Sequence, residues 1–498
     1  MSDLKYRCNG CAGEGPEVRS RRDFLARFGG GFGAVAAVHL LAREGFGELP
    51  VSQPVNPLAA RPSHFPAKAK AVIHLFMHGG PSQVDTFDPK PLLSKLHGQP
   101  PPPSILKAEE KTFLQFTKLS EAPLLPPRAT FKKYGNSGLE ISNLFEYVAQ
   151  HADDLAVIRS CYHDAFTHGP GVQLINTGVF RLGHPSMGAW TVYGLGSESE
   201  NLPAYIVMVT DGSISSGAPG YGAGFLPAVY QGTLLRKKGT PILNARAADD
   251  FAPGEQREVL DLLNWHNQRH LADHLDNSEL AARISSYELA FRMQTAVPEL
   301  TDLSNESESI RELYGLDNKE TEPFGRNCLL ARRLVERGVR FIQIYKDGWD
   351  AHTSCDENHA KNSSAVDKPI AGLLADLKQR GLLETTLVIW GGEFGRTPVT
   401  DGQSNSNVRT GDGRDHNPYG FTTWLAGGGI QGGKVIGATD EIGLRAVEDK
   451  VHVHDLHATI LSLLGLDHTK LTYFFQGRNH RLTDVGGDNN LAPRLIQS

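Results

Sequence analysis

Several short runs of this sequence are apolar at nearly every position, with no regular alternation of polar residues. The run "AVIHLFM" covers residues 71–77 and "TTLVIW" covers residues 385–390. A strand with one solvated face would alternate, so such runs predict strands buried on both faces, as in a parallel sheet covered by helices. Comparable runs predict strands at residues 155–160, 204–209, 339–345 and 421–425.

Stretches with helical spacing of apolar residues lie between these runs. Helices are predicted at residues 139–154, 327–338, 365–381 and 453–465, and a long polar-faced helical insertion at about 255–300. The strand, helix and strand over residues 339–390 form a βαβ unit, which is right-handed by default. The pattern therefore predicts an α/β fold: a mainly parallel sheet sandwiched between helices, with a helical insertion.

Length and charge limit the domain organisation and the classes of binding partner. A chain of 498 residues is too long for one small core, and a single large α/β domain is predicted at residues 71–490. The net charge of −6, with 21% charged residues, excludes a strong attraction to nucleic acid or anionic lipid. The 20 histidines are the more informative feature, because several follow predicted strands.

The N-terminal region carries a targeting pattern. In "SRRDFLARFGGGFGAVAAVHLLA", residues 20–42, Arg21 and Arg22 precede a Gly/Ala-rich, weakly apolar stretch. It resembles a bacterial twin-arginine export signal, and the alternative is an N-terminal amphipathic helix. The stretch is too short and too glycine-rich for a stable transmembrane span. We therefore predict a signal region at 1–45, a linker at 46–70, the twin-arginine export machinery as a partner, and an exported, periplasmic or otherwise extracytoplasmic location.

Polar groups follow three of the predicted strands. His78 and Glu393 come shortly after two of them, and Asp350 and His352 follow the strand at 339–345. The carboxyl ends of parallel strands line the ligand crevice, so these groups should meet at one edge of the sheet. Asp350 and His352 stand two residues apart, a spacing that projects both side chains to the same side and supplies an ordinary ligand pair for zinc, manganese or iron. Glu393 by itself is equally consistent with a loop salt bridge.

Three longer segments carry a family resemblance. They are "WGGEFGRTP", "DHNPYGFTTWLAGGGI" and "HDLHATILSLLGLDH". Together they resemble the DUF1501 family, twin-arginine-exported proteins of uncharacterised function that are abundant in planctomycete-type bacteria, over about residues 70–490. The order of strands and candidate ligands also resembles the alkaline phosphatase and sulfatase superfamily. That resemblance implies an alkaline-phosphatase-like fold and a divalent metal ion such as zinc, manganese or calcium.

The superfamily resemblance also implies roles for individual residues. Asp350, His352 and His416 match the ligands of one metal, and Glu393 stands where a second ligand pair begins. Phe394 occupies the position of that pair's histidine, so the second ligand pair is incomplete. At the end of the first strand a histidine replaces the usual aspartate, with Asp85 as a nearby substitute. The implied metal ligands are therefore His78, Asp350, His352, Glu393 and His416.

The segment "HGPGVQLINTG" matches the superfamily's nucleophile region, but with a change. It keeps Pro170 and the later TG, whereas the nucleophile position holds His168. His168 is then a further metal ligand or itself a nucleophile, or else Thr167, one residue earlier, supplies the hydroxyl. Arg396, three residues after Glu393, is a candidate for neutralising charge on the transition state.

Two functions are compatible with these features. The first is an exported metal-dependent hydrolase of sulfate or phosphate esters, acting on a small-molecule or polysaccharide substrate. The second is a non-catalytic metal-binding or interaction protein on the same fold. The many charged groups at strand ends favour the first, because unpaired buried charges are costly without a metal. The histidine at the nucleophile position favours the second.

Overall fold

A nine-stranded sheet forms the centre of Pro57–Ser498, the second of the two units into which the chain divides. The computed structural model describes residues 56–106, 119–236, 255–272, 278–401 and 411–496. The predicted signal region and residues 46–55 of the predicted linker lie outside these ranges. All elements named below belong to the second unit.

The strand order of the sheet is β12–β4–β11–β8–β1–β7–β5–β6, with β15 beside β4. The strands are β1 (Ala71–Met77), β4 (Leu155–Tyr162), β5 (Tyr205–Val209), β6 (Thr233–Leu235), β7 (Phe341–Lys346), β8 (Thr386–Gly391), β11 (Phe421–Gly427), β12 (Lys434–Ile436) and β15 (Val451–His452). Every residue of β1, β7 and β8 is buried. The predicted doubly buried strands are thus confirmed.

The sheet is mainly parallel. Strand β1 pairs in parallel with β7 on one side and β8 on the other, and β5 pairs in parallel with β7 and β6. Strand β11 runs antiparallel to both β8 and β4. An unbroken apolar run predicts burial on both faces but says nothing of direction, so this reversal could not be derived from the pattern.

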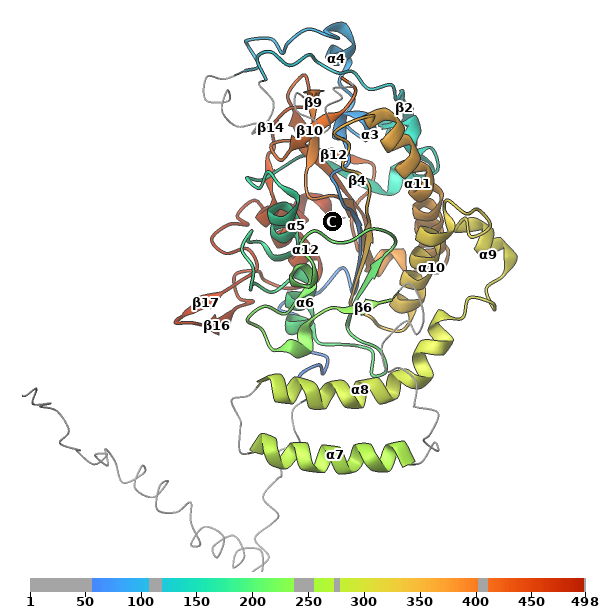
Figure 1. Ribbon diagram of the computed structural model, residues 1–498, viewed down its shortest axis with the longest axis vertical. Helices are drawn as coiled ribbons and strands as arrows, with labels where there is room; N and C mark the ends of the chain where they lie inside the picture. The colour runs from blue at the N-terminus through green and yellow to red at the C-terminus, as the bar shows by residue number, and fades with distance from the viewer. Residues whose placement is uncertain (1–55, 107–118, 237–254, 273–277, 402–410, 497–498) are drawn as a thin grey trace, which may run out of the picture. The chain divides into compact units, whose positions relative to one another are not determined.

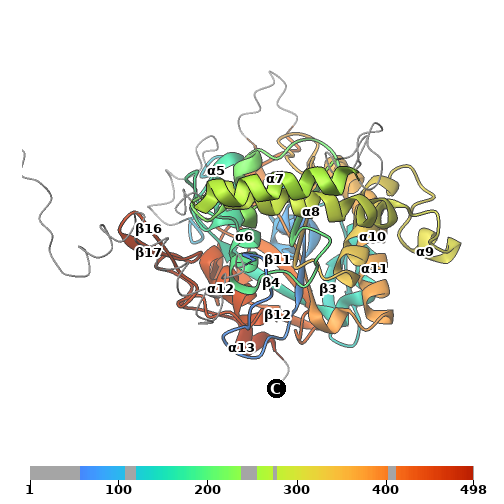
Figure 2. The same ribbon diagram turned by 90° about the horizontal axis from the view of Figure 1, so that it is seen from below.

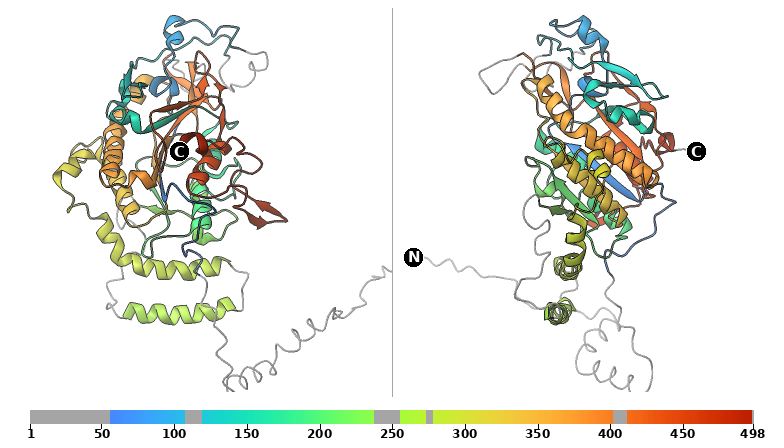
Figure 3. Two further views of the ribbon diagram at one scale, coloured as in Figure 1. Left: turned by 180° about the vertical axis from the view of Figure 1, so that it is seen from behind. Right: turned by 90° about the vertical axis from the view of Figure 1, so that its right-hand side faces the viewer.

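Helices cover both faces of the sheet (Figure 1). One layer contains α10 (Glu322–Glu336) and α11 (Cys355–Gln379), which run side by side in the right-hand view of Figure 3. The opposite layer contains α5 (His168–Thr177), α6 (Met187–Leu195) and α12 (Val453–Leu463). Alternate residues of β1 enter the two cores: Ile73 and Leu75 pack on the α10 side, and Val72 and Phe76 pack on the α5 side.

Two helices occupy the region of the predicted insertion. They are α7 (Glu255–Ala272) and α8 (Ser278–Thr301), which lie next to each other at the end of this unit (Figures 1 and 2). Among the described residues, no helix has the length and apolarity needed to cross a membrane.

The helix predicted at residues 139–154 is wrong. Residues 139–142 form strand β3 (Leu139–Ser142), paired antiparallel with β2 (Phe131–Tyr134), and two 3-10 helices follow, η2 (Asn143–Phe145) and η3 (Val148–Asp154). The side chain of Ser142 accepts the Leu144 N–H and ends the strand. Short apolar runs fit helical and strand spacing equally well, and here pairing with β2 decides between them.

The remaining elements are short and lie around the sheet. They are α3 (Gln83–Thr86), α4 (Pro91–Lys95), η4 (Ala218–Tyr221), η5 (Ala228–Tyr230), α9 (Glu308–Leu313), η6 (Leu383–Thr385), α13 (Ala492–Leu495), and the strand pairs β9 (Gly395–Thr400) with β10 (Arg414–Asn417), β13 (Ala438–Thr439) with β14 (Ala446–Glu448), and β16 (Tyr473–Phe475) with β17 (Arg478–His480).

Candidate metal centre

The carboxyl ends of β1, β7 and β8 meet at one edge of the sheet. His78 follows β1, Asp350 and His352 lie between β7 and α11, and Glu393 lies between β8 and β9. Because β1 pairs in parallel with both β7 and β8, the loops after these three strands are neighbours. The shared edge predicted from the sequence is confirmed.

Potential metal-ligating atoms at this edge form two groups. The first group contains His168, Asp350, His352 and His416, whose ligand atoms all lie within 4.8 Å of one another. The second group contains His78, His168 and Glu393, within the same limit. Three of the five predicted ligands, Asp350, His352 and His416, thus lie together with His168 in the first group. The other two, His78 and Glu393, lie in the second group, and His168 belongs to both groups.

Asp350 lies at the centre of the first group. Its Oδ1 atom is 3.0 Å from His352 Nε2 and 3.4 Å from His416 Nε2, and its Oδ2 atom is 3.1 Å from His168 Nε2. The Nε2 atoms of His352 and His416 are 3.2 Å apart. Three imidazole nitrogens and one carboxylate therefore converge on one small volume.

The other ring nitrogen of each histidine is fixed by an acceptor. The Nδ1 partners are Glu393 Oε1 for His168 at 2.6 Å, Asp401 Oδ2 for His352 at 2.7 Å, and the Phe166 carbonyl for His416 at 2.8 Å. Each Nδ1–H donates to its acceptor, so each neutral ring keeps its lone pair on Nε2. Metal-bound histidines in proteins almost always donate their second ring N–H to an acceptor in this way.

This donor set passes a test of fit for a cation. Lone pairs on nitrogen that face a carboxylate repel it unless a positive charge lies between them. The buried Nε2 atom of His168 approaches Asp350 to 3.1 Å, yet it has no partner with hydrogen-bond geometry. A divalent cation satisfies all four atoms at once.

Burial and the neighbouring carboxylates set the pKa values of these three histidines. Burial lowers the pKa of His416 to about 4, so this ring is neutral and able to ligate. Burial also lowers the pKa of His168, but the neighbouring carboxylates of Asp350 and Glu393 outweigh burial and raise the pKa to about 9. Hydrogen bonds to Asp350 and Asp401 raise the pKa of His352 to about 9. The carboxylates thus attract positive charge, which either protons or a metal ion can supply.

Glu393 supports His168 from a fully buried position. Its carboxylate accepts the Gly79 N–H at 3.0 Å as well as the His168 Nδ1–H, and its backbone carbonyl accepts the His163 Nε2–H. Gly79 has φ +112°, and a Cβ there would lie 2.4 Å from the backbone nitrogen of Asp350. Only glycine allows the loops after β1 and β7 to approach so closely.

Arg396 is also fully buried and holds Asp350. Its Nη2 donates to Asp350 Oδ1 at 2.6 Å and to the Gly79 carbonyl, while Nε donates to the Gly80 carbonyl and Nη1 to the backbone carbonyl of Arg414. Every donor nitrogen of the guanidinium is therefore directed at a protein acceptor. In this structure Arg396 positions a candidate ligand, and its predicted contact with substrate stays a prediction.

Phe394 follows Glu393 in the loop between β8 and β9. Its ring centroid is 5.1 Å from that of His168 and 4.5 Å from that of His416. The side chain is buried and packs against both imidazoles. Phe394 thus restricts the orientation of two candidate ligands and adds no donor of its own.

His78 and Thr167 differ from the first group in their surroundings. His78 Nδ1 is 2.7 Å from Asp347 Oδ1 and Nε2 is 2.8 Å from Ser215 Oγ, so both ring nitrogens have partners. Metal ligation by His78 would require the loss of one of them. Thr167 is exposed at the N-cap of α5, where its side chain makes no capping hydrogen bond.

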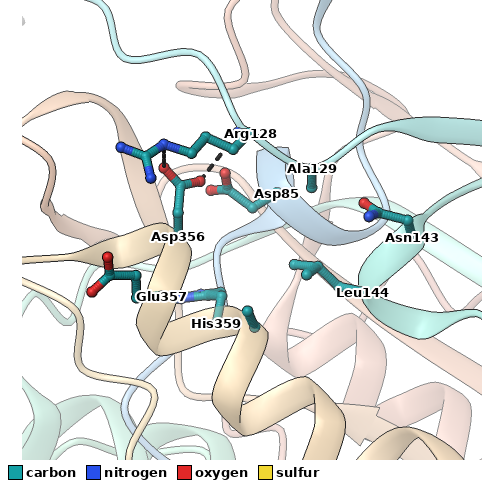
Figure 4. A pocket seen from close by; sticks show the side chains of 9 residues that line it. Asp85, Arg128, Ala129, Asn143, Leu144, Asp356, Glu357 and His359 are labelled. Atoms are coloured by element: carbon teal, nitrogen blue, oxygen red, sulfur yellow. Dashed lines mark hydrogen bonds and ion pairs between the residues drawn. The ribbon is translucent and has the colours of Figure 1, made fainter.

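Asp85, the substitute considered for His78, lies elsewhere. Its carboxylate pairs with Arg414, with 2.9 Å between Oδ2 and Nε, and it belongs to neither donor group. Together with Arg128, Asp356 and neighbouring side chains it lines a cavity of about 270 Å³ (Figure 4). His78, and not Asp85, is the residue that directly follows β1.

Sequence reasoning missed the groups that orient the candidate ligands. Asp347 directly follows β7 and Asp401 directly follows β9, so the rule that selects polar groups at strand ends also selects them. The Phe166 carbonyl and Ser215 gave no signal in the sequence, because a backbone acceptor and a loop serine are common everywhere.

The fold and the donor cluster define a class: an α/β protein with a candidate metal centre at the carboxyl edge of its sheet. The family described as "Protein of unknown function (DUF1501)" matches residues 69–493, and the chain belongs to that family. Among curated proteins, none matches the sequence.

Three solved structures illustrate what the chain is similar to. The lipoteichoic acid synthase LtaP from Listeria monocytogenes is 10% identical over 87% of this chain and 79% of its own, with a TM-score of 0.35. A mutant TAB5 alkaline phosphatase with Mg bound is 12% identical over 80% and 99%, with a TM-score of 0.33. The sulfatase PsFucS1 from Pseudoalteromonas sp. is 13% identical over 92% and 75%, with a TM-score of 0.33. At scores this low, the likenesses carry no argument about activity.

Proposed function

We propose that this protein is an exported metal-dependent hydrolase of phosphate or sulfate esters. The observation that carries the proposal is the convergence of three anchored Nε2 atoms on one carboxylate, from His168, His352, His416 and Asp350. Lone pairs that converge on a carboxylate in this way repel it unless a positive charge lies among them, and a bound cation would supply that charge. These four residues are the proposed ligands.

The donor chemistry narrows the metal. Calcium prefers six to eight oxygen ligands, whereas three imidazoles and one carboxylate suit zinc or manganese. A bound divalent ion of this kind lowers the pKa of a coordinated water to about 7 and provides a nucleophile at neutral pH. Zinc or manganese is therefore the expected metal.

The remaining residues of the site have supporting roles. Glu393 holds the His168 ring through Nδ1, and Arg396 holds the Asp350 carboxylate in place. Phe394 packs against the imidazoles of His168 and His416 and restricts their orientation. His168 acts as a ligand in this arrangement, because its Nε2 points toward the same volume as the other donors.

A non-catalytic metal-binding protein is the second candidate. The observation that favours it is the histidine at the superfamily's nucleophile position, His168, which leaves the site without the usual hydroxyl group. Under this alternative the chain binds the same metal through the same four residues and does not turn over esters.

The test combines metal analysis with hydrolysis assays. Metal content of the purified chain is measured by inductively coupled plasma mass spectrometry, and aryl phosphates and aryl sulfates serve as substrates. We expect His352→Ala and His416→Ala to lower bound metal and hydrolysis together, and His97→Ala, at an exposed histidine, to change neither. Metal without hydrolysis would favour the second candidate, and a metal-free wild-type chain would contradict both.

Two further variants distinguish whether His168 is a metal ligand or a nucleophile, and whether Thr167 is the nucleophile instead. If His168 is a ligand, His168→Ala lowers metal content and hydrolysis together. If it is a covalent nucleophile, the same variant keeps its metal and loses a trappable, acid-labile phosphohistidine. Loss of hydrolysis in Thr167→Ala, with activity retained in His168→Ala, would instead identify a hydroxyl nucleophile.

A further inference from the structure

A second cluster of side chains lies beside the candidate metal centre. The Oγ atom of Ser215 is 2.8 Å from His78 Nε2, and His78 Nδ1 is 2.7 Å from Asp347 Oδ1. The three residues follow β5, β1 and β7, which are neighbours in the sheet. A hydroxyl, an imidazole and a carboxylate are thus connected in series at the same sheet edge.

The hydrogen bonds fix the direction of this series. The Asp347 carboxylate can only accept, so His78 Nδ1 carries the proton between them. In the neutral ring Nε2 is then an acceptor, and the backbone N–H of Ser215 also points to it at 3.4 Å. The Ser215 hydroxyl therefore donates to Nε2, which is the arrangement of a nucleophile, a general base and an orienting carboxylate.

The loop that carries the serine is anchored to the strand that carries the carboxylate. The backbone N–H of Asp347 donates to Asp211 Oδ1 at 3.1 Å. Gly212 has φ +61°, and a Cβ there would lie 1.8 Å from Asp347 Oδ2, so this close approach requires glycine. Ser215 is exposed while His78 is buried, which leaves the nucleophile accessible and its base sheltered.

We propose that Ser215, His78 and Asp347 form a second hydrolytic centre, which cleaves neutral carboxylic esters through an acyl-serine intermediate. Neutral esters fit this cluster better than phosphates or sulfates, because the neighbouring carboxylates of Asp347, Glu393 and Asp211 would repel an anion. The neighbouring Lys346 is already paired, with 2.9 Å between its Nζ and Asp211 Oδ2. The cluster therefore offers no free cation to an anionic substrate among these residues.

The reaction balances without an oxidant, a reductant or a metal. The Ser215 oxygen attacks the acyl carbon while its proton passes to His78 Nε2. That proton then goes to the leaving alcohol as the ester C–O bond breaks. In the second half, water attacks the acyl-serine, His78 takes the proton and returns it to Ser215, and a carboxylic acid is released.

The test uses the full-length chain and a fluorophosphonate probe, which reacts with activated serines. Labelling is followed with and without a chelator, and the modified peptide is located by mass spectrometry; hydrolysis of p-nitrophenyl acetate is measured in parallel. We expect labelling of Ser215 that resists the chelator. We expect Ser215→Ala to abolish it, and His78→Gln and Asp347→Asn to slow it by roughly 100-fold or more.

Ser213→Ala is the matched control, because this exposed serine lies in the same loop. It should keep full labelling and ester hydrolysis. Circular dichroism and urea unfolding of every variant confirm that the fold is retained. The proposal is overturned if Ser215 is not labelled, if His78→Gln labels at the wild-type rate, or if the chelator abolishes labelling. The comparison with and without chelator separates this centre from the metal-dependent activity, because only the metal-dependent activity should require the ion.

Discussion

The candidate metal centre makes a sharp prediction about Asp401, a residue that does not touch the metal position. Its carboxylate is nearly fully buried and accepts the Nδ1–H of His352 at 2.7 Å. In Asp401→Asn the amide oxygen accepts more weakly than a carboxylate. If the amide instead turns its NH2 group to Nδ1, the ring proton moves to Nε2 and removes the lone pair that binds metal.

The expected magnitude follows from this single contact. Removal of the carboxylate that orients a metal-bound histidine typically weakens metal affinity by about 10- to 100-fold, or about 1.4–2.7 kcal/mol. A hydrogen bond to a charged group contributes about 1.5–3 kcal/mol, which agrees with that range. Because the other three proposed ligands keep their anchors, the site should weaken and not disappear.

The assay is competition for zinc between the protein and a chromophoric chelator of known affinity. Asp317→Asn, at an exposed aspartate, serves as the control and should leave the dissociation constant unchanged. Asp401→Asn should raise it by about 10- to 100-fold while the far-ultraviolet circular dichroism stays that of the wild type. A folded Asp401→Asn with wild-type zinc affinity would refute the assignment of His352 as an anchored ligand.

Three further predictions concern acid stability, backbone geometry and export. Burial lowers the pKa of His74 to about 3. The folded state therefore loses stability as the pH falls from 6.5 toward 3, because the unfolded chain takes up a proton that the buried ring does not. His74→Leu should reduce the stability loss between pH 7 and pH 5, measured by urea unfolding, by about 2 kcal/mol. Gly79→Ala should cost more stability than Gly98→Ala, where φ is also positive, at +76°, but an added Cβ would meet open space; equal urea midpoints would contradict the steric argument. Replacing both arginines, Arg21→Lys and Arg22→Lys, should retain the chain in the cytoplasm, as cell fractionation would show.

Much of the fold could be predicted because its information is local. The apolar runs at 71–77 and 386–390 are buried strands whichever strands they pair with, and they correspond to β1 and β8. The segment 139–154 failed because its apolar spacing suits more than one structure, and only pairing with β2 makes Leu139–Ser142 a strand. Direction is equally non-local, as the antiparallel pairing of β11 with β8 shows.

By itself, the sequence determined which residue types follow the buried strands: His78, Asp350, His352 and Glu393 follow strand ends, and strand ends share an edge. Only the tertiary structure decided which of these residues lie in the candidate metal centre and which lie in the cluster around Ser215. It placed His168 with Asp350, made Glu393 the anchor of that histidine, and joined His78 to Ser215. The physical reason is that periodicity acts over a few residues, whereas a contact such as Gly79 with Glu393 joins positions 314 residues apart and depends on how the whole sheet is assembled.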